Sequence, residues 1–119
     1  FLELGGKSAA IILDDADFST CAMMAAFMIT SHAGQGCAQT SRLLVPRAHH
    51  DDIVELVRQN FGLITHGDPA DPATFMGPLI SERQRDKVDA MVQRAVAAGA
   101  TLVTGGHRMD PGYFYAPTL

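Results

Sequence analysis

Cysteine is scarce in this sequence. Cys21 and Cys37 are the two cysteines among 119 residues, and they lie in unrelated sequence contexts. The pair provides neither a disulfide framework nor a C-x-x-C motif. Unpaired thiols are typical of a reducing compartment, so we expect a cytoplasmic protein.

Long apolar runs and an excess of positive charge are also missing. The most apolar segment, CAMMAAFMI, is far shorter than the roughly 20 residues of a membrane helix. The first residues show no signal-peptide pattern. A formal net charge of −4 provides no general attraction to nucleic acid or to an anionic membrane, so we expect neither partner. Because the chain begins with Phe1 rather than Met, we expect it to be a piece of a longer protein.

Nucleotide-binding fingerprints are absent as well. Gly5 and Gly6 precede Lys7, but the spacing G-x-x-x-x-G-K-[ST] of a phosphate-binding loop is not there. Gly34 and Gly36 are not followed by the third glycine of a G-x-G-x-x-G turn. The sequence therefore contains no nucleotide-binding fingerprint.

Hydrophobic periodicity predicts an alternation of strands and helices. We expect strands over 8–13, 41–45 and 101–104, helices over 17–32, 49–61 and from Ser81 to Gly99, and an extended segment over 113–118. The buried stripes of the first and third helices are expected at Phe18, Cys21, Ala25, Met28, Ile29, Val88, Met91, Val92, Ala95 and Val96. This order indicates an α/β fold with a mainly parallel sheet and flanking helices. With 47% hydrophobic residues, residues 1–119 are sufficient for a single domain.

Cys37 is the first candidate for chemistry. It lies in AGQGCA, where its small neighbours Gly36 and Ala38 leave room for a substrate carbon. The thiolate is the reactive form of cysteine, and backbone N–H groups of a glycine-rich turn can bind an oxyanion. The alternative is a small buried hydrophobic residue, which is the usual setting of a free cysteine.

Glu3 is the second candidate, because it lies between Leu2 and Leu4 in FLELGGK. Burial would raise the pKa of its carboxyl group and make it a general base near neutral pH. A solvated carboxylate near a chain end is the alternative interpretation.

The histidines provide weaker candidates. His49 and His50 are adjacent and would point about 100° apart on a helix, so we expect no metal site there. His32 is close to Cys37 in the sequence and is a conceivable base for the thiol, but the sequence does not show that the two side chains meet.

Seven short motifs occur in an order that resembles the catalytic domain of the aldehyde dehydrogenase superfamily. They are LELGGKS at 2–8, DDAD at 14–17, GQGC at 34–37, GDPADP at 67–72, MGPLIS at 76–81, TGG at 104–106 and GYFYAPTL at 112–119. The resemblance covers essentially the whole chain. Its most specific part is the pair of ELGGK and GQ-x-C, in which Glu3 and Cys37 are 34 residues apart in the sequence.

The resemblance implies a function for both candidate residues. Cys37 would attack an aldehyde, hydride would pass to NAD or NADP, and water activated by Glu3 would hydrolyse the resulting thioester. Family members that transfer the acyl group to coenzyme A tend to lack this glutamate, so Glu3 favours hydrolysis. The resemblance also implies that Leu4 and Gly5 contact the cofactor, that Gln35 and its neighbouring glycines shape the turn, and that the parent protein is a homo-oligomer.

The chain is much shorter than the proteins it resembles. We expect a partial catalytic domain over 1–119, without the cofactor-binding domain, the asparagine that helps to bind the oxyanion, or the oligomerisation strand. Alone, it should bind NAD poorly and turn over slowly. Two other functions stay open from the residues: a non-catalytic binding or assembly module from a truncated gene, and a cysteine acyltransferase without redox chemistry.

Overall fold

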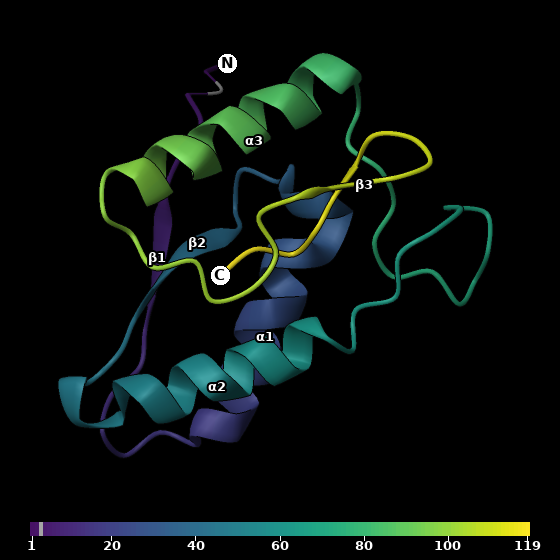
Figure 1. The fold of residues 1–119 in the computed structure, drawn as a ribbon. Helices are drawn as coiled ribbons and strands as arrows, with labels where there is room; N and C mark the ends of the chain where they lie inside the picture. The colour runs from purple at the N-terminus through teal and green to yellow at the C-terminus, as the bar shows by residue number, and fades with distance from the viewer. Residues whose placement is uncertain (3) are drawn as a thin grey trace. The chain divides into compact units, whose positions relative to one another are not determined.

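The computed structural model describes residues 1–2 and 4–119, and these divide into two compact units, Phe1–Ile64 and Thr65–Leu119. Each unit is α/β in composition and has its own buried residues. Figure 1 labels most of their helices and strands.

A two-stranded parallel sheet organises the first unit. β1 (Ser8–Ile11) pairs with β2 (Thr40–Leu44), with Ser8 opposite Thr40 and Ile11 opposite Leu44. α1 (Phe18–Thr30) connects the two strands, as expected for a parallel pair, which needs a crossover between its strands. The predicted parallel pairing is therefore confirmed, with strand bounds shifted by one to two residues.

α1 begins at an aspartate cap. Asp17 Oδ1 accepts hydrogen bonds from the N–H groups of Ser19 and Thr20, at 3.0 and 3.3 Å. These bonds satisfy backbone donors that the first turn of a helix leaves unpaired. At the other end, the Thr30 hydroxyl donates to Ala26 O at 2.7 Å, and the 3-10 helix η1 (Ser31–Gly34) follows. The helix is thus shorter than the predicted 17–32.

The buried face of α1 differs from the prediction. Ala22 and Ala26 are fully buried and Thr30 is 4% exposed, whereas Met28 is 45% exposed and Cys21 is half-buried. α1 packs against α2 (His50–Phe61), which follows the 3-10 helix η2 (Arg47–His49). Small side chains allow two helix backbones to approach closely, which explains why the alanine face of α1 is the buried one. The rest of this core is Ile12, Ile53, Val57, Phe61 and Ile64.

The second unit begins with a turn-rich loop, as predicted for 65–80. Within it, Thr65 O accepts hydrogen bonds from the N–H groups of Phe75 and Met76, and the Thr65 hydroxyl donates to Ala73 O at 2.7 Å. α3 (Glu82–Ala97) follows, and its N-cap Ser81 accepts a hydrogen bond from the Gln84 N–H at 3.2 Å. The predicted start of this helix at Ser81 is confirmed.

A short antiparallel hairpin packs against α3. It consists of β3 (Arg108–Met109) and β4 (Phe114–Tyr115). Asp89 on α3 accepts hydrogen bonds from the Tyr115 hydroxyl and from Arg108 Nε, at 3.1 and 3.0 Å. These contacts cover the first half of α3, and the buried side chain of the helix is Arg85, which donates to Gly112 O at 3.0 Å.

Two predictions for this unit are wrong. Residues 101–104, all of which the structure describes, form no strand, because their backbone pairs with the single residue Leu119 rather than with a run of residues. The predicted stripe of α3 is only partly covered: Val88 and Val92 are half-buried, whereas Met91, Ala95 and Val96 are exposed. The hairpin contacts explain this, since they centre on Arg85 and Asp89.

Candidate active site

Cys37 lies in the turn that leads into β2, and its side chain is exposed. The turn is closed by a hydrogen bond from the Gln39 N–H to Gly36 O at 3.4 Å. The interpretation of Cys37 as a small buried hydrophobic residue is therefore wrong. An exposed thiol on a backbone turn is accessible to a carbonyl compound.

The strand register brings the Gly5–Lys7 segment to the same end of the sheet as Cys37. Ser8 is opposite Thr40, so the residues before each strand continue side by side. Arg42 Nε donates to Lys7 O at 2.9 Å and holds the two segments together. A Cβ atom built on Gly6 would lie 3.9 Å from Cys37 O, which is ordinary van der Waals contact. The backbones at Gly6 and Cys37 therefore lie next to each other.

Gly5 borders an open space next to this contact. Its φ is +69°, a conformation that favours glycine, and a Cβ atom built on it would have no atom of the described residues within 4 Å beyond its chain neighbours. Leu4 is 86% exposed. Among the described residues, the backbone of Gly5 is thus open to a flat ligand, and contact of Leu4 and Gly5 with a cofactor stays a prediction. Glu3 lies outside the described residues.

A left-handed backbone segment precedes the cysteine turn. His32 and Ala33 have φ of 49° and 53°, and Gly34 has φ of 75°. This region of φ is unfavourable for residues with a side chain and persists where surrounding contacts impose it. The His32 Nδ1 is hydrogen-bonded to Ser31 Oγ at 3.2 Å, which directs this ring nitrogen toward Ser31 rather than toward the thiol.

The other histidines have separate environments. The His49 ring packs on Phe18 with centroids 4.8 Å apart, and His50 Nδ1 lies 2.8 Å from Asp51 Oδ1. Among the described residues, no group of three or more His, Cys, Asp or Glu side chains could hold a metal ion. No helix in this described part is long and apolar enough to cross a membrane.

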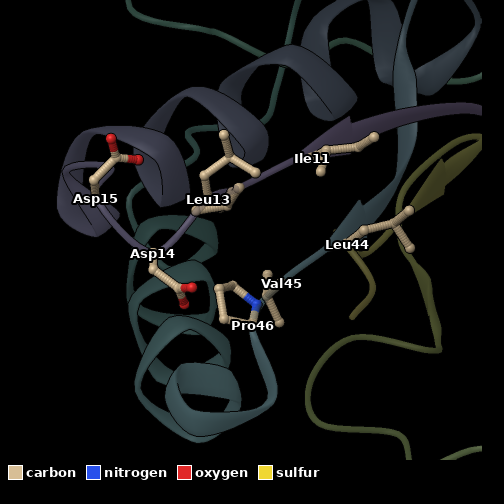
Figure 2. Close-up of a pocket in the computed structure, with 8 residues that line it drawn as sticks. Ile11, Leu13, Asp14, Asp15, Leu44, Val45 and Pro46 are labelled. Atoms are coloured by element: carbon tan, nitrogen blue, oxygen red, sulfur yellow. The ribbon is translucent and has the colours of Figure 1, made fainter.

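A shallow hollow of about 580 Å³ lies at the opposite, carboxyl ends of β1 and β2. Figure 2 shows Ile11 and Leu13 from the β1 segment and Leu44 and Val45 from the β2 segment around it. Ligands of open α/β sheets often bind at the carboxyl ends of strands. The hollow is lined by none of the predicted site residues that the structure describes: Leu4 and Gly5 precede β1, and Cys37 precedes β2.

Sequence reasoning missed two residues near Cys37, of which Gln39 shapes the turn and Arg42 holds the neighbouring segment. Gln39 Oε1 accepts a hydrogen bond from the Gly36 N–H at 2.9 Å, and Arg42 joins β2 to Lys7. A polar residue between a candidate nucleophile and a predicted strand is a weak signal, and only the folded turn reveals what Gln39 contacts.

Comparison with known proteins gives one consistent family. The model of the aldehyde dehydrogenase family matches residues 1–119. A succinate-semialdehyde dehydrogenase (NADP(+)) of Deinococcus radiodurans is 43% identical over 99% of this chain and 25% of its own length. A mitochondrial aldehyde dehydrogenase of Leishmania tarentolae is 40% identical over 99% of this chain and 24% of its own length. The chain thus spans about a quarter of the length of these relatives.

The solved structures agree with this match. The crystal structure of a Mycobacterium tuberculosis aldehyde dehydrogenase complexed with NAD+ has a TM-score of 0.92 and 44% identity, and it covers 98% of this chain and 25% of that chain. An aldehyde dehydrogenase from Sinorhizobium meliloti has a TM-score of 0.93 and 38% identity over 98% of this chain and 23% of its own.

Proposed function

The chain belongs to the aldehyde dehydrogenase family, and we propose on this basis that the full-length protein oxidises an aldehyde to a carboxylic acid with NAD or NADP. Residues 1–119 would form part of its catalytic domain, with the cofactor-binding domain elsewhere in the protein. The observation that carries the proposal is the exposed Cys37, whose carbonyl oxygen would lie 3.9 Å from a Cβ atom on Gly6, the residue next to the open Gly5.

Cys37 acts as the nucleophile. Its thiolate attacks the aldehyde carbon, a C–S bond forms, and the electron pair of the carbonyl moves to the oxygen. An aldehyde is a poor hydride donor until this addition places an oxyanion on its carbon, which is the advantage of covalent catalysis. When the oxyanion collapses, the carbon loses hydride and becomes a thioester of Cys37.

Glu3 acts as the base for release. It takes a proton from water as the oxygen of that water attacks the thioester carbon, and the C–S bond then breaks to give the acid and the free thiolate. Leu4 and Gly5 are the residues that would contact the cofactor. When bound, NAD or NADP accepts the hydride. The relatives named above include proteins described with each dinucleotide, which supports this cofactor class.

The two cysteines of the chain provide a matched test in the full-length protein. Cys37→Ala should lower aldehyde-dependent reduction of the cofactor by more than about 10⁴-fold, as expected for the loss of a covalent nucleophile. Cys21→Ala, on the half-buried face of α1, should keep near-normal activity. A Cys37→Ala variant with full activity would refute the proposed role.

The same assay separates the two other functions. Acyl transfer that proceeds without reduction of the cofactor would favour a cysteine acyltransferase. A full-length protein that oxidises no aldehyde in a broad panel, although it is folded, would favour a non-catalytic module. The expected homo-oligomer and the cytoplasmic location are parts of the same proposal, and the free state of both thiols agrees with a reducing compartment.

A further inference from the structure

The side chain of Gln39 spans the loop that carries Cys37. Its Nε2 donates a hydrogen bond to Ser31 O, and its Oε1 accepts one from the Gly36 N–H at 2.9 Å. The two partners are the first residue of η1 and the residue directly before Cys37. One carboxamide thus joins both ends of the segment between them.

This segment contains the left-handed residues His32, Ala33 and Gly34. Two of them carry side chains, so the conformation needs contacts that hold it. Further bonds inside the loop go from the Gln35 N–H and Gln35 Nε2 to His32 O, at 3.2 and 3.0 Å. The bonds of Gln39 are those that fix the loop to the first residue of β2, since Gln39 directly precedes Thr40.

Gly36 is shaped to receive this side chain. A Cβ atom on Gly36 would lie 3.2 Å from Gln39 Cδ and 3.3 Å from Gln39 Cγ. Gly36 is not among the glycines with positive φ. The absence of a side chain at position 36 is therefore explained by the contact with Gln39 rather than by the backbone conformation. Glycine at 36 and glutamine at 39 therefore form one unit.

We propose that Gln39 is a positioning residue for the Cys37 nucleophile. Its side-chain oxygen Oε1 accepts the hydrogen bond from the Gly36 N–H, and this bond fixes the backbone direction of the next residue, Cys37. In the part of the chain that the structure describes, the N–H groups of Cys37 and Ala38 both lack a hydrogen-bond partner, so both donors of this turn stay available to an oxyanion. This inference rests on the proposed function, because positioning matters only if Cys37 attacks a carbonyl carbon.

The bonds of Gln39 are local and lie at a partly exposed turn, so their loss should change the turn rather than unfold the protein. In the full-length protein, Gln39→Met keeps the length of the side chain and removes both hydrogen bonds. We expect kcat to fall about 10- to 100-fold, the range for a misplaced reacting group, with KM changed less than about threefold. Gln59→Met, which removes an exposed glutamine amide on α2, is the control and should leave kcat unchanged.

Hydrogen exchange provides a readout that needs no cofactor. In Gln39→Met, amide exchange should become faster in the peptide covering residues 31–39 and stay unchanged in α2. Gln39→Glu retains an acceptor for the Gly36 N–H, so it should restore part of the protection. Normal exchange in Gln39→Met, or normal kcat together with faster exchange, would overturn the positioning role.

A double-substitution cycle tests the unit of Gly36 and Gln39. Gly36→Ala should lower kcat because its Cβ displaces Gln39, and Gly36→Ala combined with Gln39→Ala should cost less than the product of the two separate losses. Additive losses would contradict the inference. If the wild-type protein oxidises no aldehyde, the proposed function itself fails, and with it any catalytic role for Gln39, whatever the exchange result.

Discussion

Substitution of Gly105 by alanine should strongly destabilise the second unit. Gly105 has φ of +78°, and a Cβ atom on it would lie 2.1 Å from Pro117 O, a backbone atom, whereas real Cβ contacts under 3.0 Å essentially never occur. The left-handed backbone costs about 1–2 kcal/mol for a residue with a side chain. Overpacking against a backbone that cannot rotate away adds about 1–3 kcal/mol. We therefore expect a loss of about 4 kcal/mol in the free energy of unfolding.

Gly99 provides the matched control in the same unit. Its φ is +98°, but a Cβ atom on it would have no atom within 4 Å. Gly99→Ala should therefore show only the backbone cost, about 1 kcal/mol. Urea unfolding of the purified full-length protein, followed by circular dichroism, measures both variants. Equal destabilisation by the two substitutions would refute the steric reasoning for Gly105, and so would a loss at Gly105 of less than about 1 kcal/mol.

Three further outcomes are expected. In the full-length protein, Glu3→Gln should keep the initial burst of reduced cofactor but slow the later turnover, since deacylation then lacks its base; loss of the burst with an intact fold would contradict the base role. Asp17→Ala should lower the thermal midpoint more than Asp17→Asn, because asparagine can still accept the Ser19 N–H. Hydrogen bonds from the Thr20 side chain and backbone lower the pKa of Asp17, so the stability that its carboxylate contributes should be lost as the pH falls through that lowered pKa. Burial and the hydrogen bond to Asp89 raise the pKa of Tyr115 from 10.0 to about 12, so the stability of the second unit should fall as the pH rises from about 10 to 12. Tyr115→Phe should reduce this fall, and an equal pH dependence of stability in both proteins would contradict the assignment.

The sequence predicted the elements with the clearest signals. Asp17 and Ser81 are capping residues that act within one helical turn, so the starts of α1 and α3 could be predicted from the residues nearby. The parallel pairing of β1 and β2 followed from the helix between them. These features depend on interactions that are close in sequence or on a general rule of chain connection.

The misses have physical reasons in the tertiary structure. The segment of α1 from Cys21 to Ile29 is apolar on every side, so periodicity could not choose between the Met28 face and the alanine face that packs on α2. The strand predicted at 101–104 needed a neighbour along its length and has only Leu119. β3 has two residues, too few to show alternation.

The geometry around the candidate site residues could not be predicted from the sequence, and their roles stay predictions. The motifs indicated Cys37, Glu3, Leu4 and Gly5; the structure describes Cys37 before β2 and Leu4 and Gly5 before β1, whereas Glu3 lies outside the described residues. The approach of the two described segments depends on a register that pairs Ser8 with Thr40, which no local pattern determines. The hydrogen bonds of Gln39 could not be predicted from the sequence either, because they form only when the loop adopts its left-handed backbone conformation.

Mass spectrometry of the Cys37 peptide decides whether this sulfur forms the covalent bond on which the proposed reaction depends. The sample is the full-length Glu3→Gln protein, mixed with an aldehyde substrate and the oxidised cofactor and quenched in acid during turnover. We expect the acyl mass of the substrate on the peptide that contains Cys37, and none on the peptide that contains Cys21. Aldehyde oxidation in the wild-type protein, with an acyl mass on another residue or on none in the trapped variant, would contradict the assignment of Cys37.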